Sequence, residues 1–142
     1  MTRWMAQLAG VAMLASTIAV IGTNRLDRSP RQPAKWHDVT LLYVGAEDCA
    51  PCRSWHRGAG EAFRSSPEFH RVSYRQVKSP TVLDLLKDQY WPDDLREYRS
   101  RLDRGAGVPL WLVISEHEIV EQAFGESQWE STVLPKLKSL LR

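Results

Sequence analysis

The 142-residue chain is long enough for one domain of ordinary size and a short additional segment. Its hydrophobic content of 43% and its charged content of 25% exclude a largely disordered protein. The formal net charge is only +2, and the basic residues are scattered among acidic ones, so we expect no nucleic-acid partner.

The N-terminal residues form a segment of their own. No charged residue occurs from Trp4 to Asn24, and Arg3 precedes this stretch. About 20 apolar residues are enough to cross a bilayer, so the pattern predicts a signal peptide or signal anchor in residues 1–24. The stretch is long for a cleaved signal and lacks a clear cleavage site. We therefore favour an uncleaved hydrophobic helix that attaches the protein to a membrane.

A linker is predicted between this segment and the globular part. Residues 25–37 contain two prolines and little apolar periodicity, and the domain is expected to span 38–142. Arg25, Arg28 and Arg31 follow the apolar stretch, and the positive-inside rule alone would place the domain in the cytoplasm. A single basic residue before an apolar stretch is common in export signals, and we favour export of the domain.

The hydrophobic pattern of the domain alternates between strands and helices. A strand–helix–strand start implies a parallel pair with a crossover helix, and a later hairpin adds antiparallel strands. The predicted class is therefore α/β, with a mixed central sheet flanked by helices on both faces. In chain order we expect a strand at 39–45, a helix at 53–66, a strand at 70–77, helices at 79–86 and 91–102, strands at 108–115 and 118–124 joined by a tight turn at Glu116 and His117, and a helix at 127–141.

Local signals modify two of these helices. Gly58 and Gly60 weaken the first one, each by about 1 kcal/mol relative to Ala. Ser127 and Glu130 match the capping-box pattern and predict the start of the last helix. Pro135 lies inside that helix, where it either bends the helix or marks its true first turn.

The two cysteines of the chain are Cys49 and Cys52, at the point where the first strand gives way to a helix. At a helix N-terminus, backbone N–H groups and the helix dipole favour a thiolate. Thiols in such motifs have pKa values of about 3.5 to 7.5, against about 8.5 for a free thiol. The spacing predicts Cys49 as the nucleophile and Cys52, one turn into the helix, as the resolving thiol.

Two other uses of this pair remain open. As a structural staple it would close a very short loop, which stabilises a protein less than a long one does. As a metal site it has too few ligands for structural zinc, but Cu(I) could bind Cys49, Cys52 and His56. We favour redox chemistry over both, and we expect no resident metal or cofactor.

A second motif completes a resemblance to a known family. The sequence GVP precedes the predicted hairpin, and Gly125 ends it. Together with the CxxC pair and the element order, this closely resembles the thioredoxin superfamily over residues 38–142. The resemblance implies a thioredoxin-like fold in which Pro109 is cis and faces the cysteines, while the backbone of Val108 pairs with extended substrate segments.

Within the superfamily, the run CAPCRSWHR resembles two kinds of bacterial protein. It is most similar to periplasmic proteins linked to sulfur oxidation, of the SoxS/SoxW type, and next to the membrane-anchored TlpA/ResA type. This resemblance implies thiol–disulfide exchange with disulfide-containing protein substrates at the periplasmic side of the inner membrane in a bacterial cell envelope. Electrons would come from a membrane thiol reductase of the DsbD/CcdA type.

Two positions depart from thioredoxin itself. Asp48 replaces the tryptophan before the first cysteine, and a carboxylate there opposes the thiolate of Cys49. Tyr43 stands where thioredoxin has a buried aspartate that helps to deprotonate the second cysteine. We expect Glu47, Asp48 or His56 to take over that role.

The predicted function is a thiol–disulfide oxidoreductase that reduces disulfides of exported proteins. The alternative is a protein of the same fold that binds Cu(I) or a partner without reductase turnover.

Overall fold

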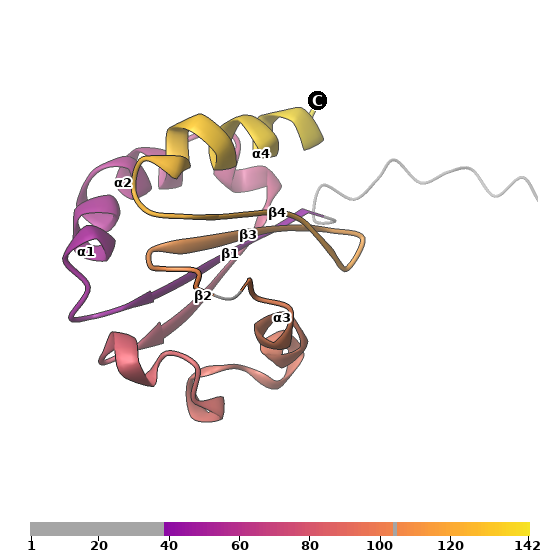
Figure 1. The fold of residues 1–142 in the computed structure, drawn as a ribbon. Coiled ribbons are helices and arrows are strands. Elements are labelled where there is room, and N and C mark those ends of the chain that lie inside the picture. The colour runs from indigo at the N-terminus through magenta and orange to yellow at the C-terminus, as the bar shows by residue number, and fades with distance from the viewer. Residues whose placement is uncertain (1–38, 104) are drawn as a thin grey trace, which may run out of the picture. The chain divides into compact units, whose positions relative to one another are not determined.

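A mixed sheet lies at the centre of the computed structural model, which describes residues 39–103 and 105–142. The strand order is β2-β1-β3-β4; β1 runs parallel to β2, and β3 runs antiparallel to both β1 and β4 (Figure 1). This is the mixed α/β architecture predicted from the sequence. The strands are β1 (Val39–Ala46), β2 (Ser73–Ser79), β3 (Leu110–Ser115) and β4 (Glu118–Phe124).

The sheet separates two hydrophobic cores. Successive residues of β1 point to opposite faces, so Leu41 and Tyr43 enter one core while Leu42 and Val44 enter the other. The first core lies beneath α1 (Ala50–Arg57), α2 (Ala59–Arg64) and α4 (Leu134–Leu140), and the second beneath α3 (Arg96–Ser100) and the turns before it (Figure 1). The prediction of helices on both faces is confirmed.

The hairpin between β3 and β4 has the predicted tight turn. Glu116 and His117 have positive φ angles of 51° and 66°. This left-handed backbone at both central residues matches the twist of the flanking strands.

The helix expected at 53–66 is divided in two. The N–H of Gly58 donates to the carbonyls of Ser54 and Trp55 at 3.0 and 3.2 Å, which ends α1, and α2 begins one residue later. The break falls at the first of the two glycines that were expected to weaken this helix. Gly60 is buried and lies against the indole ring of Trp55.

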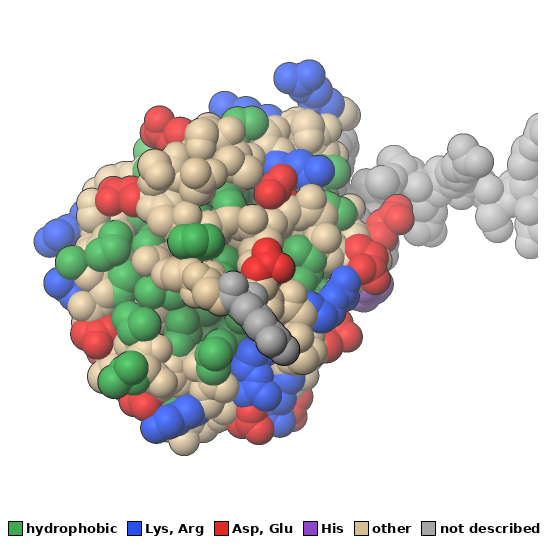
Figure 2. All heavy atoms as spheres, viewed as in Figure 1, with side chains coloured by type: hydrophobic (Ala, Val, Ile, Leu, Met, Phe, Trp, Pro, Cys, Tyr) green, Lys and Arg blue, Asp and Glu red, His purple; other side chains and the backbone are tan. Residues whose placement is uncertain are grey.

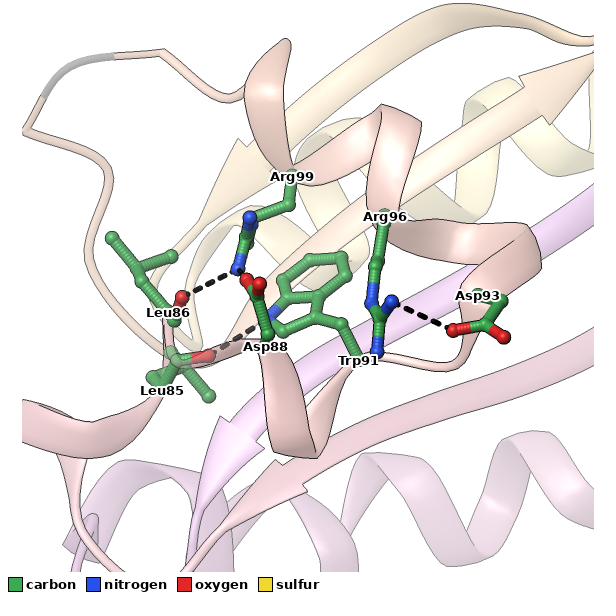
Figure 3. A network of polar contacts seen from close by, with 7 residues as sticks. All are labelled: Leu85, Leu86, Asp88, Trp91, Asp93, Arg96 and Arg99. Atoms are coloured by element: carbon green, nitrogen blue, oxygen red, sulfur yellow. Dashed lines mark hydrogen bonds and ion pairs between the residues drawn. The ribbon is translucent and has the colours of Figure 1, made fainter.

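The helix expected at 79–86 does not form, and that prediction is wrong. The chain instead makes single 3-10 turns at Val82–Asp84, Asp88–Tyr90 and Asp93–Leu95, and the helix expected at 91–102 is reduced to the last of these turns and α3. Side chains hold this path in place of helical hydrogen bonds: the Trp91 indole donates to the carbonyl of Leu85 at 2.7 Å, and Arg99 donates to that of Leu86 at 2.8 Å (Figure 3).

Strand boundaries also differ from the prediction: the strand expected at 39–45 ends at Ala46, and the one expected at 108–115 begins at Leu110. The strand expected at 70–77 begins at Ser73, after a 3-10 turn at Phe69–Arg71, and extends to Ser79. Val72, just before the strand, and Tyr74 contact the first core, whereas Gln76 is exposed and Val77 is buried in the second.

The C-terminal helix begins without the predicted capping box. Gln128 occupies the cap position of a π-helical turn at Trp129–Val133, and its side chain makes no capping hydrogen bond. Pro135 lies in the first turn of α4, the second of its two expected roles. Proline has no N–H to donate to the preceding turn, which is consistent with the wider turn ahead of it.

The predicted signal anchor at 1–24 and linker at 25–37 lie outside the described residues. Within 39–103 and 105–142, no helix has the length and apolar character needed to cross a membrane.

Gly60 provides a test of the packing beneath α2. A Cβ at this position would come within 2.9 Å of both the Trp55 ring and its backbone carbonyl oxygen. Gly60→Ala is therefore expected to lower the free energy of unfolding by about 1 to 3 kcal/mol, although alanine is the better helix former. Urea unfolding measures this change.

The exposed Ala62 on the same helix is the matched control. Ala62→Gly should lower the free energy of unfolding by about 1 kcal/mol, which is the difference in helix propensity between the two residues. A Gly60→Ala variant as stable as the parent protein would contradict the packing described here.

Candidate functional site

The cysteine pair lies at the N-terminus of α1. Cys49 and Cys52 form a disulfide, with their Cα atoms 5.2 Å apart. Cys49 has an extended backbone (φ −78°, ψ 108°) and acts as the cap of the helix, because its sulfur accepts a hydrogen bond from the Cys52 N–H at 3.1 Å. Pro51 stands in the first turn, where a missing N–H costs nothing.

The two sulfur-bearing residues differ in exposure. Cys49 is 6% exposed and Cys52 is 1% exposed. Both belong to the first core, and the helix carries Cys52 inward toward Trp55. An incoming partner therefore has more access to Cys49 than to Cys52.

The second predicted motif lies at the same end of the sheet. The Val108–Pro109 bond is cis, as the resemblance implied. Leu110 pairs with Val44 in the register of β1 and β3, which places the preceding residues at the level where β1 leads into the cysteine loop. Val108 contacts both cores, and no hydrogen bond between described residues uses its backbone N–H or C=O.

A short segment after β4 closes the site on another side. The N–H of Gly125 donates to the carbonyl of Pro109 at 2.8 Å, and Gly125 has a left-handed backbone with φ 87°. The next residue, Glu126, accepts a hydrogen bond from the Ser54 hydroxyl on α1 at 2.7 Å. The cysteine helix and the proline loop are thus both bonded to the same two-residue segment.

The acidic residues before Cys49 are exposed and bonded to neighbouring loops. The Asp48 carboxylate accepts the N–H of Val82 at 2.9 Å. The backbone carbonyl of Glu47 accepts a hydrogen bond from Arg53 at 2.7 Å. The Asp48 carboxylate therefore binds the turn at 82–84.

Tyr43 stands where the resemblance to thioredoxin led us to look for a buried aspartate, and it is 1% exposed. Its ring stacks on Trp55 with the centroids 5.2 Å apart, and burial raises its pKa to about 12. A phenol with this pKa is neutral at physiological pH and cannot act there as a base. Among the described residues no carboxylate is buried, so this part of the site lacks a buried anionic group.

His56 packs edge-on against the same aromatic rings. Its ring centroid lies 4.6 Å from that of Tyr43 and 5.1 Å from that of Trp55. Burial, with the positive charges of Lys78 and Arg64, lowers the pKa of His56. Its buried Nε2 has no hydrogen-bond partner among the described residues.

The three-ligand copper site considered from the sequence is not assembled. Within residues 39–103 and 105–142, no group of three or more His, Cys, Asp or Glu side chains lies close enough together to hold a metal ion. His56 instead packs among the aromatic rings of the first core.

Comparison with known proteins gives structural similarities alone. No protein-family model and no curated protein matches the chain. The structure is similar to oxidised thioredoxin from Plasmodium falciparum (12% identity, TM-score 0.48), covering 76% of this chain and 86% of that one. It is also similar to the thioredoxin Mala s 13 from Malassezia sympodialis (13% identity, TM-score 0.48), covering 72% of this chain and 81% of that one. A third similar structure is thioredoxin from Trypanosoma brucei brucei (15% identity, TM-score 0.49), covering 75% of this chain and 79% of that one.

The fold class rests on features of the molecule itself. A β2-β1-β3-β4 mixed sheet, a CxxC pair at the start of the helix after β1 and a cis proline before β3 together define a thioredoxin-like fold.

Two bonds at the site were not predicted from the sequence. The Ser54–Glu126 bond joins residues 72 positions apart, and the Asp48–Val82 bond joins residues 34 positions apart. Neither pair carries a local motif, so no sequence signal could have identified them.

The pKa shift of His56 predicts a pH dependence of stability. Because folding lowers this pKa, protonation favours the unfolded chain, so the stabilisation is present above about pH 6.5 and is lost as the pH falls below it. Urea unfolding at about pH 7.5 and pH 5 should show a smaller loss of stability for His56→Gln than for the parent protein. An equal loss in both would show that His56 titrates as an ordinary exposed histidine.

Proposed function

We propose that this protein is a thiol–disulfide oxidoreductase with Cys49 as the nucleophile and Cys52 as the resolving thiol. The observation that carries this proposal is the position of the cysteine pair at the N-terminus of α1. The two cysteines are joined at a helix N-terminus, and the Cys52 amide already donates to the sulfur of Cys49. The same N–H would stabilise a Cys49 thiolate after reduction.

The reaction proceeds through two exchanges. In the reduced protein, the Cys49 thiolate attacks one sulfur of a substrate disulfide; a Cys49–substrate disulfide forms and the other substrate sulfur leaves as a thiolate that takes up a proton. The Cys52 thiolate then attacks Cys49, releasing the second substrate thiol and forming the Cys49–Cys52 disulfide. Two electrons pass to the substrate, and a dithiol donor restores the reduced pair.

The resolving step lacks the usual buried base. Cys52 must lose its proton before it attacks, and the apolar surroundings disfavour its thiolate. Tyr43 is too weak an acid to hold a negative charge there at neutral pH. We expect the release of substrate from Cys49 to be slow at low pH for this reason.

We propose the setting of the reaction from the sequence alone. The proposed substrates are disulfide-containing exported proteins, with Val108 and Pro109 binding their extended segments. The proposed electron donor is a membrane thiol reductase of the DsbD/CcdA type. The N-terminal segment would hold the domain at the periplasmic side of a bacterial inner membrane. The backbone of Val108, which bonds to no other described residue, supports the role in substrate binding.

The direction of electron flow is tested by the reduction potential of the pair. Equilibration in defined glutathione buffers, followed by thiol trapping, should give a value near that of thioredoxin, about −270 mV. A value near −120 mV would identify an oxidant instead of a reductant. A pair that does not cycle at all would refute the proposed function.

The two cysteines should respond differently to substitution. Cys49→Ser removes the nucleophile and should abolish reduction of a protein disulfide such as that of insulin. Cys52→Ser keeps the nucleophile but removes the thiol that releases the substrate, so a mixed disulfide at Cys49 should accumulate. Non-reducing gel electrophoresis and mass spectrometry detect this adduct. An adduct formed equally by Cys49→Ser would contradict the assigned roles.

A further inference from the structure

His56 lies one helical turn after Cys52. Both residues are inside α1, and residues four apart on an α-helix have their Cβ atoms about 5 to 6 Å from each other. Side chains of a helix lean toward its N-terminus, so Trp55 and His56 both lean over the turn that carries Cys52. Of these two side chains only the imidazole has a nitrogen that can accept a proton, because the indole nitrogen is a donor alone.

The Nε2 atom of His56 is buried and bonds to no described residue. A buried polar atom without a partner is an exception in folded proteins, and a catalytic role is one reason for keeping it. The ring is held by its neighbours, since it packs edge-on against Tyr43 and Trp55. The residue as a whole is only half-buried, so a proton can pass from the imidazole to water. His56 therefore offers a fixed acceptor that no described donor occupies.

The surroundings of His56 keep its ring in the neutral form. Burial lowers the pKa of His56, and the positive charges of Lys78 on β2 and Arg64 on α2 lower it further. The phenols of Tyr43 on β1 and of the neighbouring Tyr74 on β2 add no charge, because burial raises the pKa of both. A neutral imidazole can accept a proton, whereas an imidazolium cannot.

The carboxylates next to the pair are less suited to take a proton from Cys52. Glu47 and Asp48 are exposed, and the Asp48 carboxylate already accepts the N–H of Val82. Acidic and basic side chains are interspersed over the face drawn in Figure 2, as on an ordinary solvated surface. A carboxylate in water is a weaker base than a neutral imidazole. Among these groups His56 is therefore the best proton acceptor.

We propose that His56 accepts the proton of Cys52 in the resolving step, which makes it a further catalytic residue of the exchange. This inference rests on the proposed function, since it concerns the step in which Cys52 releases the substrate. The S–H proton of Cys52 moves to Nε2 of His56, a bond forms between the sulfurs of Cys52 and Cys49, and the bond between Cys49 and the substrate breaks. The substrate leaves as a thiolate that takes up a proton from water, and the imidazolium gives its proton to water.

The test follows one turnover of the reduced full-length protein with an excess of dithiobis(nitrobenzoate), an aromatic disulfide that releases coloured thiolates. Attack by Cys49 releases the first thiolate in a phase whose rate rises with the reagent concentration. Attack by Cys52 releases the second in a phase whose rate does not depend on that concentration, so stopped-flow absorbance separates the two steps. His56→Gln should slow the second phase about a hundredfold near pH 7, the factor that a positioned base provides, with little effect on the first.

The pH profile of the second phase gives a readout that a purely structural role would not move. In the parent protein its rate should be nearly constant between about pH 6.5 and pH 8, because the proton moves within the protein. The rate should fall at lower pH, as His56 becomes protonated at its lowered pKa. In His56→Gln the rate should instead rise about tenfold per pH unit across the same range, since Cys52 must lose its proton to water.

His70→Gln is the matched control, because this histidine is exposed and lies outside α1, and both phases should keep their parent rates. Imidazole added to His56→Ala should restore much of the second phase, which a loss of packing alone would not allow. A second phase as fast in His56→Gln as in the parent protein, or one in His56→Ala that imidazole leaves unchanged, would overturn the proposal. If the parent protein releases only one coloured thiolate or none, the proposed function itself fails.

Discussion

The domain depends on one strand that is buried on both faces. β1 lies between β2 and β3, and its alternate side chains enter two separate cores. The strand ends at Ala46, and Cys49 caps the following helix only three residues later. Both cores therefore fix the position of the Cys49 sulfur. A strand in this position requires a continuous apolar run instead of an alternating one, and the sequence VTLLYVGA meets that requirement.

The elements that could be predicted from the sequence are those with a local signal, such as the apolar run of a strand that is buried on both faces. Strands and the hairpin turn are encoded locally, by apolar runs and by the chain reversal at Glu116 and His117, and the structure confirms them. The cis form of the Val108–Pro109 bond was expected from the family resemblance, because no local property of the sequence specifies it.

The helix expected at 79–86 does not form, because distant contacts and not the local sequence determine the backbone there. Its path is set by side chains elsewhere, such as Asp48 and Trp91, that bond to the backbone of the turns. The predicted capping box is absent because Pro135 moves the start of the regular α-helix to Leu134.

The interior beside the cysteines is aromatic instead of charged. Tyr43 stands in place of a carboxylate, its burial keeps it neutral, and the lowered pKa of His56 keeps the imidazole neutral near pH 7. The full charges close to the pair along the chain are thus on exposed residues, Glu47, Asp48 and Arg53. Electrostatic control of the proposed exchange would then come from the helix N-terminus and from the exposed charged residues around the pair, which salt screens, and less from a buried ion.

Trp55 on α1 and two tryptophans packed against it form a cluster with an optical consequence. Trp55, Trp111 and Trp129 are almost fully buried, and their rings lie within 5.0 to 5.5 Å of one another. Trp55 follows Cys52 by three residues on the same helix and shares its core. Indole emission is quenched by a neighbouring disulfide, and excitation energy moves readily between rings at this separation. We therefore expect the intrinsic fluorescence of the protein to differ between the oxidised and the reduced cysteine pair, without any added label.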